Sequence, residues 1–185
     1  MRFQLEQLRI PVFHGAGSFA DPFCVRVENE YGDVTRVRAR HFIIASGSKP
    51  REHPTVPIDG KYIMTSDHIA SLERFPDSMV ILGAGVIGCE YATIFSKFKQ
   101  TKVYLIDRAE RILPFEDPDI SGRCAMNFKR RDVTIHSECS LDSMQVRDGV
   151  VEYVVVDNVS RAKKTVRVER ALLSIGRAPN IDGLG

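Results

Sequence analysis

The first 48 residues contain short stretches in which apolar and polar side chains alternate. Residues 23–28 and 35–39 alternate with period two around a turn at residues 30–33, and residues 41–45 form a further apolar stretch. Such alternation is typical of β-strands with one buried face. We therefore predict a short helix followed by a β-rich segment, with strands at each of these three stretches.

The pattern changes to an α/β order from residue 78. Residues 79–82 form a continuous apolar run, as expected of a strand buried on both faces of a parallel sheet. The predicted elements after this strand are a helix over residues 86–98, a strand over 102–106, a helix from its cap Asp117 to residue 131, and strands at 133–135, 150–156, 165–168 and 171–175. The fold class expected is α/β, with a Rossmann-like parallel sheet, its helices and a β-meander.

A loop rich in proline joins these two parts. It carries Pro50, Pro54 and Pro57, and a short helix within it should start at residues 65–67, where a Thr or Ser hydroxyl can cap the first turn. Pro76 should end that helix.

The main candidate site is a glycine turn between the strand at 79–82 and the helix at 86–98. Its sequence is GAGVIG, comprising Gly83, Ala84, Gly85, Val86, Ile87 and Gly88. Gly83 permits a tight turn, Gly85 lets the backbone approach a pyrophosphate, and Gly88 lets the helix pack closely on the strand. The free amides at the helix start favour an anion, so we predict a dinucleotide pyrophosphate here.

Asp107 is placed to bind the adenosine ribose, because it ends the next strand about twenty residues further on. A carboxylate there accepts hydrogen bonds from both ribose hydroxyls and repels a 2′-phosphate, by about 4 kcal/mol at about 4 Å and an effective dielectric constant of about 20. Arg108 is either a solvated surface residue or turns inward to bind that phosphate. The comparison favours NAD(H) over NADP(H).

Composition excludes several other classes of protein. The 26 Lys and Arg residues nearly balance the 24 Asp and Glu residues, which gives a net charge of +2 and no electrostatic argument for a nucleic-acid or membrane partner. The four cysteines are scattered, so no zinc site, other metal site or redox pair is expected. The first residues lack the apolar core of a signal peptide, which makes a cytoplasmic location the expectation.

Three motifs together resemble one family, the FAD-dependent pyridine nucleotide-disulfide oxidoreductases. They are FIIASGSKP at residues 42–50, ILGAGVIGCE at 81–90 and IGRAPN at 175–180, in the order that the family shows. The stretch GVIGCEYATIF is particularly similar to dihydrolipoyl dehydrogenases and soluble pyridine nucleotide transhydrogenases. The resemblance implies that this chain is the NAD(P)H-binding part of a flavoprotein oxidoreductase that passes hydride from NAD(P)H to FAD.

The resemblance also implies roles for single residues. Glu90 would lie near the nicotinamide and the flavin, Gly176 would line the dinucleotide cleft, and Ser140 would offer a backbone contact to adenine. Val86 stands where some members carry a gating tyrosine, so that gate is expected to be absent. The positions that would approach FAD in the longer protein are Gly17, Ser46, Gly47 and Ser48.

On this interpretation the chain is a fragment of a homodimeric enzyme. Residues 1–48 would belong to the FAD domain, residues 49–176 would form the NAD(P)H-binding domain, and residues 177–185 would begin the return to the FAD domain. The remaining FAD and dimerisation domains would be its partners, and the isolated chain should bind dinucleotide without catalysis. The alternatives are a stand-alone dinucleotide-binding or sensing module, and a stand-alone Rossmann dehydrogenase or methyltransferase, which lacks support because no Tyr-x-x-x-Lys pair is present.

Overall fold

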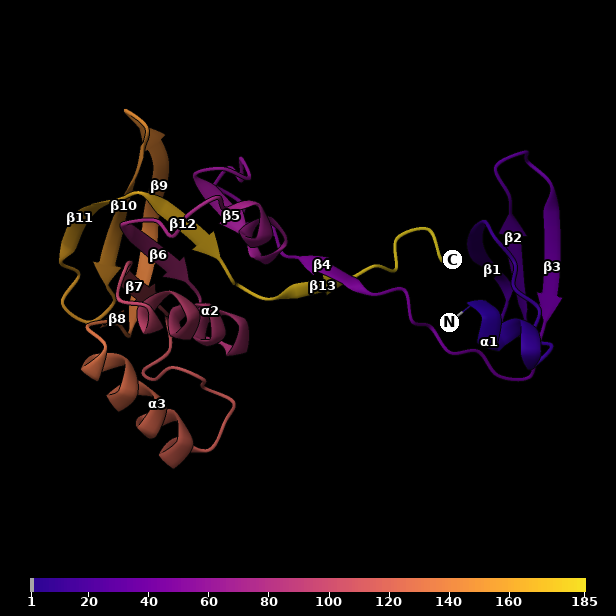
Figure 1. The fold of residues 1–185 in the computed structure, drawn as a ribbon, viewed down its shortest axis with the longest axis horizontal. Coiled ribbons are helices and arrows are strands. Elements are labelled where there is room, and N and C mark those ends of the chain that lie inside the picture. Colours follow the sequence, from indigo (N-terminus) through magenta and orange to yellow (C-terminus); the bar gives the residue numbers. More distant parts are fainter. Residues whose placement is uncertain (1) are drawn as a thin grey trace. The chain divides into compact units, whose positions relative to one another are not determined.

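The computed structural model describes residues 2–185, which divide into two compact units (Figure 1). The first unit combines the residues up to 48 with residues 179–185, and the second comprises Lys49–Ala178. Among the described residues, no helix is both long and apolar enough to cross a bilayer.

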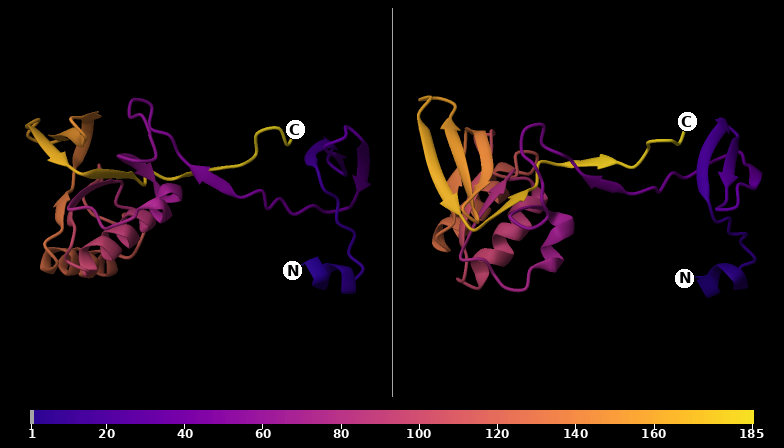
Figure 2. Two further views of the ribbon diagram at one scale, coloured as in Figure 1. Left: turned by 45° about the horizontal axis from the view of Figure 1, so that its top comes forward. Right: turned by 90° about the horizontal axis from the view of Figure 1, so that it is seen from above.

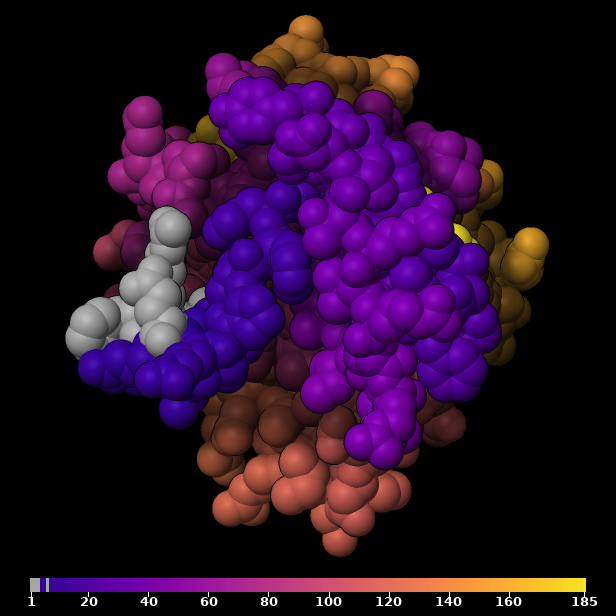
Figure 3. All heavy atoms as spheres, turned by 90° about the vertical axis from the view of Figure 1, so that its right-hand side faces the viewer, coloured from indigo at the N-terminus to yellow at the C-terminus, as the bar shows by residue number. Residues whose placement is uncertain are grey.

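The first unit contains a short helix and a small antiparallel sheet. Its elements are α1 (Arg2–Gln7), β1 (Ala16–Asp21), β2 (Cys24–Glu28) and β3 (Val34–Arg38), with the strands in the order β1-β2-β3. The turn between β2 and β3 is closed by Asn29, whose side-chain oxygen accepts the N–H groups of Tyr31 and Asp33 at 2.9 and 2.8 Å. The predicted strands at 23–28 and 35–39 are confirmed, and β1 was not predicted. In Figure 3 the described residues of this unit up to 48 are coloured indigo to purple, and residues 179–185 are yellow.

The strand predicted at residues 41–45 is wrong. This stretch has no regular secondary structure, and Ile43 and Ile44 are 94% and 57% exposed. A strand requires hydrogen-bonding partners on a neighbouring strand, and no described strand pairs with this stretch. Its apolar composition alone therefore does not produce a strand.

The second unit is built on a five-stranded parallel sheet, which confirms the predicted α/β fold class. Its order is β5 (Ile63–Thr65), β12 (Arg170–Leu173), β6 (Ser78–Leu82), β7 (Lys102–Ile106) and β8 (Thr134–His136). Each neighbouring pair is parallel. The residues from Met79 to Ile81 are completely buried, as the continuous apolar run predicted.

The helices begin at the predicted residues. Helix α2 spans Val86–Lys97, and α3 spans Pro118–Arg130 after its cap Asp117, whose carboxylate accepts the N–H of Asp119 at 2.9 Å. The helix predicted to start at residues 65–67 is the 3₁₀ helix η1 (Ser66–Ser71), with Thr65 at its N-cap position.

A three-stranded antiparallel meander packs on the parallel sheet. It consists of β9 (Cys139–Arg147), β10 (Val150–Asp157) and β11 (Lys163–Val168), in the order β11-β10-β9. The meander was expected, but β9 was not among the predicted strands. The remaining strands, β4 (Ser48–Pro50) and β13 (Arg177–Pro179), form a separate two-stranded sheet.

Two buried clusters occupy the two faces of the parallel sheet. One joins it to the meander, through residues such as Tyr153 and Val151 of β10, which are completely buried. The other joins it to the helices, through residues such as Phe95 of α2 and Phe128 of α3. The two views in Figure 2 show the helices on one side of the sheet and the meander on the other. Because both faces of the sheet are buried, the positions of its strands are fixed, and so are the positions of the loops that follow their carboxyl ends.

Candidate functional site

The order of the strands creates a crevice at the carboxyl edge of the sheet. From β6 the chain passes through α2 to β7 on one side, whereas β12 lies on the other side of β6. The loops that follow β6 and β12 therefore leave the sheet in different directions. In open α/β sheets, ligands bind at this kind of switch point.

Two glycines of the turn after β6 are required by the packing of the protein itself. Gly83 has a φ of +99°, and a Cβ there would lie 2.5 Å from the carbonyl oxygen of Ser174. A Cβ at Gly88 would overlap the carbonyl oxygen of Gly83 and lie 2.8 Å from Ser174 Oγ. These contacts hold the start of α2 against the ends of β6 and β12.

Gly85 differs from both, because the protein does not fill the space beside it. Its φ is −74°, which any residue can adopt, and apart from its chain neighbours no described atom lies within 4 Å of a Cβ built there. Gly85 is also the N-cap residue of α2, and no described side chain caps the helix. The turn thus presents an open backbone at the positive end of a helix.

Asp107 lies directly beside this turn. Its Oδ2 accepts the N–H of Ala84 at 2.6 Å, and its Oδ1 accepts the N–H of Ala109 at 2.9 Å. The spacing in the sequence predicted the proximity but not these bonds to the backbone. Since a carboxylate oxygen accepts two hydrogen bonds, each oxygen keeps one acceptor position for another donor.

Ala84 is held from its other side as well. Its carbonyl oxygen accepts the N–H of Leu113 at 2.8 Å and the thiol of Cys89 at 3.4 Å. Burial, with Cys124 and Asp107 nearby, raises the pKa of Cys89 to about 12, so the thiol stays protonated and remains a donor. The middle of the turn is therefore fixed before any ligand arrives.

Leu113, which bonds to Ala84, belongs to the loop between β7 and α3, and one arginine stabilises this loop. The guanidinium of Arg111 donates to the carbonyl oxygens of Pro114 and Glu116 at 2.8 and 2.9 Å. Ser121 Oγ adds a bond to the carbonyl of Ile112 at 2.5 Å, which ties the loop to the start of α3. Sequence analysis did not single out Arg111, whose role is to fix the backbone that supports the turn.

The other predicted dinucleotide contacts lie around the same edge. Val86 and Glu90 are exposed on the first turns of α2, Ile87 is half-buried between them, and Arg108 is exposed beside Asp107. Ser140 lies further along, in β9, where its hydroxyl donates to Asn158 Oδ1 at 2.7 Å.

Gly176 lies three residues beyond the end of β12, across the crevice from the turn. It has a φ of +110°, and its carbonyl oxygen accepts the N–H of Arg51 at 3.0 Å. The Arg51 side chain continues past it, with Nε donating to the carbonyl of Arg177 at 3.1 Å. The sequence motifs did not indicate this arginine, although it follows Pro50 directly.

The four residues assigned to FAD contacts belong to the first unit or its edge. Gly17 is in β1, opposite Val27 of β2. The carbonyl oxygens of Ser46 and Gly47 accept the side-chain and backbone N–H groups of Asn180 at 3.2 and 3.0 Å, and Ser48 is the first residue of β4.

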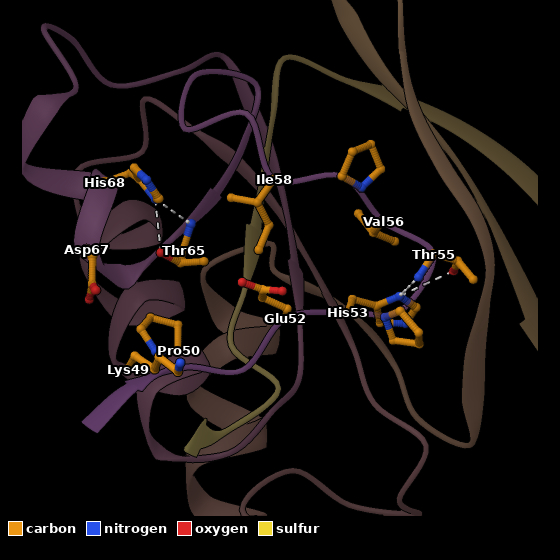
Figure 4. Close-up of a pocket in the computed structure, with 12 residues that line it drawn as sticks. Lys49, Pro50, Glu52, His53, Thr55, Val56, Ile58, Thr65, Asp67 and His68 are labelled. Atoms are coloured by element: carbon orange, nitrogen blue, oxygen red, sulfur yellow. Dashed lines mark hydrogen bonds between the residues drawn. The ribbon is translucent and has the colours of Figure 1, made fainter. Parts of the chain in front are cut away.

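Two further cavities have linings that do not include the glycine turn. One, of about 720 Å³, is lined by residues from 49–58 together with Thr65, Asp67 and His68 (Figure 4). The other, of about 680 Å³, lies near the amino ends of β5 and β12 and includes Arg170. Within the part of the chain that the structure describes, no group of three or more His, Cys, Asp or Glu residues is arranged to hold a metal ion.

Comparison with known proteins gives consistent matches along the whole chain. The family described as pyridine nucleotide-disulphide oxidoreductase matches residues 3–185. Dihydrolipoyl dehydrogenase of Bacillus subtilis is 34% identical over 184 residues, and a soluble pyridine nucleotide transhydrogenase of Pseudomonas fluorescens is 35% identical over 178 residues. These matches cover 100% and 96% of this chain but only 39% and 37% of the two relatives.

Solved structures show the same architecture. The crystal structure of LpdA from Mycobacterium tuberculosis matches 100% of this chain and 40% of its own, with a TM-score of 0.85 and 25% identity. The HOCl-induced flavoprotein disulfide reductase RclA from Escherichia coli matches 99% of this chain and 40% of its own, with a TM-score of 0.74. At 23% identity, the second match shows a shared fold alone.

Proposed function

This chain belongs to the pyridine nucleotide-disulphide oxidoreductase family, and from that premise we propose that residues 49–178 bind a nicotinamide dinucleotide across the carboxyl edge of the parallel sheet. The family resemblance of the sequence motifs is confirmed by this match. The chain spans about two fifths of its relatives, 39% and 37% of their lengths, so the proposal for the longer protein goes further. That protein would be a FAD-dependent oxidoreductase of the dihydrolipoyl dehydrogenase or transhydrogenase type.

The open space beside Gly85 is the observation that carries the proposal. Gly83 and Gly88 are glycines because their surroundings exclude a Cβ, whereas nothing in the described protein excludes one at Gly85. At the uncapped start of a helix, an open glycine is explained by a ligand that must reach the backbone. The uncapped start of α2 lies at the same place and favours a phosphate group.

Asp107 supports binding of the adenosine ribose next to that phosphate. Its two bonds to Ala84 and Ala109 hold the carboxylate still, and one acceptor position on each oxygen remains for the two ribose hydroxyls. The same charge disfavours a 2′-phosphate, and Arg108 beside it offsets part of that repulsion. We therefore assign NADH as the preferred dinucleotide.

The residues of this chain bind and orient the dinucleotide. Gly85, Val86 and Ile87 offer backbone N–H groups at the start of α2, and Gly176 bounds the crevice on the β12 side. Glu90 is exposed one turn along α2, where it would contact the nicotinamide end of the dinucleotide. Val86 is also exposed there, and it has no aromatic ring that could cover the nicotinamide. When bound, the nicotinamide supplies a hydride for which a flavin is the acceptor.

The flavin contacts are assigned to the first unit. Gly17, Ser46, Gly47 and Ser48 would contribute backbone to a FAD site completed by other parts of the longer protein, which we propose to be a homodimer in the cytoplasm. The 185-residue chain should accordingly bind dinucleotide and catalyse no reduction.

Calorimetric titration of the 185-residue chain with NADH and NADPH tests the proposal. We expect saturable binding of both, with NADH tighter by about tenfold, because Asp107 disfavours the 2′-phosphate. Tighter binding of NADPH would overturn the preference, and absence of binding by either would overturn the dinucleotide site itself.

A further inference from the structure

Residues 51–56, called the strap below, run along the carboxyl edge of the sheet and are anchored at both ends. At one end the N–H of Arg51 bonds to Gly176, just beyond β12. At the other end Val56 is 4% exposed and packs in the cluster that contains the last residues of β6 and β7. Because neighbouring strands are about 4.8 Å apart, a strap of this length is long enough to reach from β12 to β7.

The strap lies on the opposite side of this edge from the start of α2. Val56 belongs to the cluster on the meander face, whereas Cys89 and Ala92 of α2 belong to the cluster on the helix face. A ligand on the glycine turn would thus have α2 on one side and the strap on the other. Figure 4 shows the strap from Glu52 to Val56 as it borders the adjoining cavity.

His53 presents a hydrogen-bond donor from the middle of the strap. Its Nδ1 accepts the backbone N–H of Thr55 at 3.3 Å and also contacts Thr55 Oγ1 at 3.3 Å (Figure 4). Since Nδ1 must keep its lone pair for these bonds, the proton of the neutral ring resides on Nε2.

The positive charge of Arg108 acts on the ring of His53. Burial, and then the positive charge of Arg108, lower the pKa of His53, so the ring is neutral near pH 7 while its Nε2–H remains a donor. His53 and Arg108 come from different segments, the strap and the loop after β7, and Arg108 directly follows Asp107.

Arg51 offers donors at the other end of the strap. Its side chain passes 3.6 Å from the position of a Cβ on Gly176, and its Nε is bonded to the carbonyl of Arg177. This bond holds the side chain beside Gly176, just beyond β12, and the residue is exposed. Terminal guanidinium groups bind phosphate oxygens well.

We propose that the strap is the second wall of the dinucleotide groove, with Arg51 binding the pyrophosphate and the Nε2–H of His53 joining Arg108 at the 2′ position of the adenosine. This inference rests on the proposed function and adds two contacts to it. Arg51 would serve both dinucleotides, because both contain the pyrophosphate. His53 would serve the 2′-phosphate and so moderate the preference for NADH that Asp107 sets.

The role of Arg51 is tested by titrating Arg51→Ala with NADH and with NADPH. We expect both dissociation constants to rise by about tenfold, because one charge-assisted bond to phosphate is lost. The backbone bond to Gly176 does not depend on the side chain, so the strap stays anchored in this variant. Arg130→Ala, on the exposed end of α3, is the matched control and should bind like the unaltered chain.

The role of His53 is tested with a pair of variants. His53→Asn keeps an acceptor near the Nδ1 position and removes the Nε2 donor, whereas His53→Gln places an amide donor near Nε2. We expect His53→Asn to weaken NADPH binding by about tenfold and to leave NADH within about twofold, and His53→Gln to retain most of the NADPH affinity. His14→Asn, on an exposed histidine of the first unit, is the control.

The outcomes separate this inference from the function on which it rests. If the unaltered chain binds neither dinucleotide, the proposed function fails and the strap assignment fails with it. If the chain binds NADH and the Arg51 and His53 variants bind both dinucleotides unchanged, the strap is no wall of the groove and this inference alone is overturned. An equal loss of NADPH and NADH in His53→Asn would contradict the assignment to the 2′ position.

Discussion

Asp107 has two sets of partners to satisfy, the backbone of its own protein and the ribose of a ligand. The first set is seen directly, in the bonds from Ala84 and Ala109 to opposite carboxylate oxygens. A side chain that braces the turn in advance lowers the ordering that binding would otherwise require. It also means that substitution of Asp107 alters the turn as well as the ligand contact.

Asp107→Asn should therefore affect both stability and binding. An amide group can accept on one side only, so one of the two backbone N–H groups would face an NH₂ group, at a cost of about 1–3 kcal/mol in the free energy of unfolding. We also expect NADH affinity to fall by about tenfold or more. Urea denaturation and calorimetric titration measure the two effects, and Asp142→Asn, at an exposed ion pair with Lys163, is the control. Unchanged stability would contradict the bracing role.

His136 should make the stability of the second unit depend on pH. Its ring is stacked on Tyr104, its Nε2 is buried without a hydrogen-bond partner among the described residues, and burial followed by the charge of Lys164 lowers its pKa below 6.5. The unfolded chain then binds a proton more readily than the folded one, so stability falls as the pH drops from about 6.5 toward the folded pKa.

The measurement is the unfolding midpoint in urea between pH 7.5 and 5. His136→Phe keeps a ring against Tyr104 and removes the titrating group, so its stability should fall less over this range than that of an exposed control, His41→Gln. Parallel curves for the two variants would show that His136 does not carry the effect.

At the scale of elements, the glycine turn contains two glycines that folding requires, Gly83 and Gly88, and one that ligand binding requires, Gly85. Gly88→Ala should destabilise the chain by about 3 kcal/mol, because the new methyl group overlaps the carbonyl of Gly83. Gly85→Ala should fold with unchanged stability and bind NADH at least about tenfold more weakly, since its Cβ enters space that only a ligand would occupy. Gly122→Ala, in an open position on α3, should be slightly stabilising by about 0.5–1 kcal/mol.

Thermal and urea unfolding with parallel NADH titrations distinguish these three variants. Loss of stability in Gly85→Ala would contradict the interpretation that the fold does not need Gly85. Full NADH affinity in a folded Gly85→Ala would contradict the interpretation that a ligand approaches it.

The sequence predicted the elements that apolar runs and helix caps mark, and missed β1 and β9, whose pairing is irregular. The strand β6 and the helices α2 and α3 were predicted because continuous apolar runs and caps such as Asp117 mark them locally. The strand β9 was missed because only Cys139 and Met144 are buried in it and a bulge shifts its register with β10. A strand was wrongly predicted at residues 41–45, because the sequence of this stretch does not indicate whether a partner strand lies beside it.

The candidate site was predictable to a similar extent. The turn at residues 83–88 and Asp107 follow from a known spacing, and the structure places them side by side. Arg51 and His53 belong to no motif, and only the long-range bonds of the strap bring them to the carboxyl edge. Basic residues interleaved with Pro50, Pro54 and Pro57 were the available signal, because prolines stiffen a loop that must hold side chains in place.

At the scale of the whole molecule, the proposed dinucleotide site belongs to one of the two units. Every residue of the two buried clusters lies within Lys49–Ala178, and so do the glycine turn, Asp107, Gly176 and the strap. A continuous segment with its own core on both faces of a sheet is expected to fold without the rest of the chain.

Residues 49–178 expressed alone should therefore unfold in one cooperative transition and bind NADH within about twofold of the affinity of the 185-residue chain. The comparison uses circular dichroism for unfolding and calorimetry for binding, with Gly85→Ala in both lengths as the matched control for specific binding. The shorter segment lacks Ser48 and Pro179 of the β4–β13 pair but keeps the bonds of Arg51 to Gly176 and Arg177. A folded segment that binds NADH more than about tenfold more weakly would show that the first unit supports the groove, and the dinucleotide site would then have to be assigned to both units together.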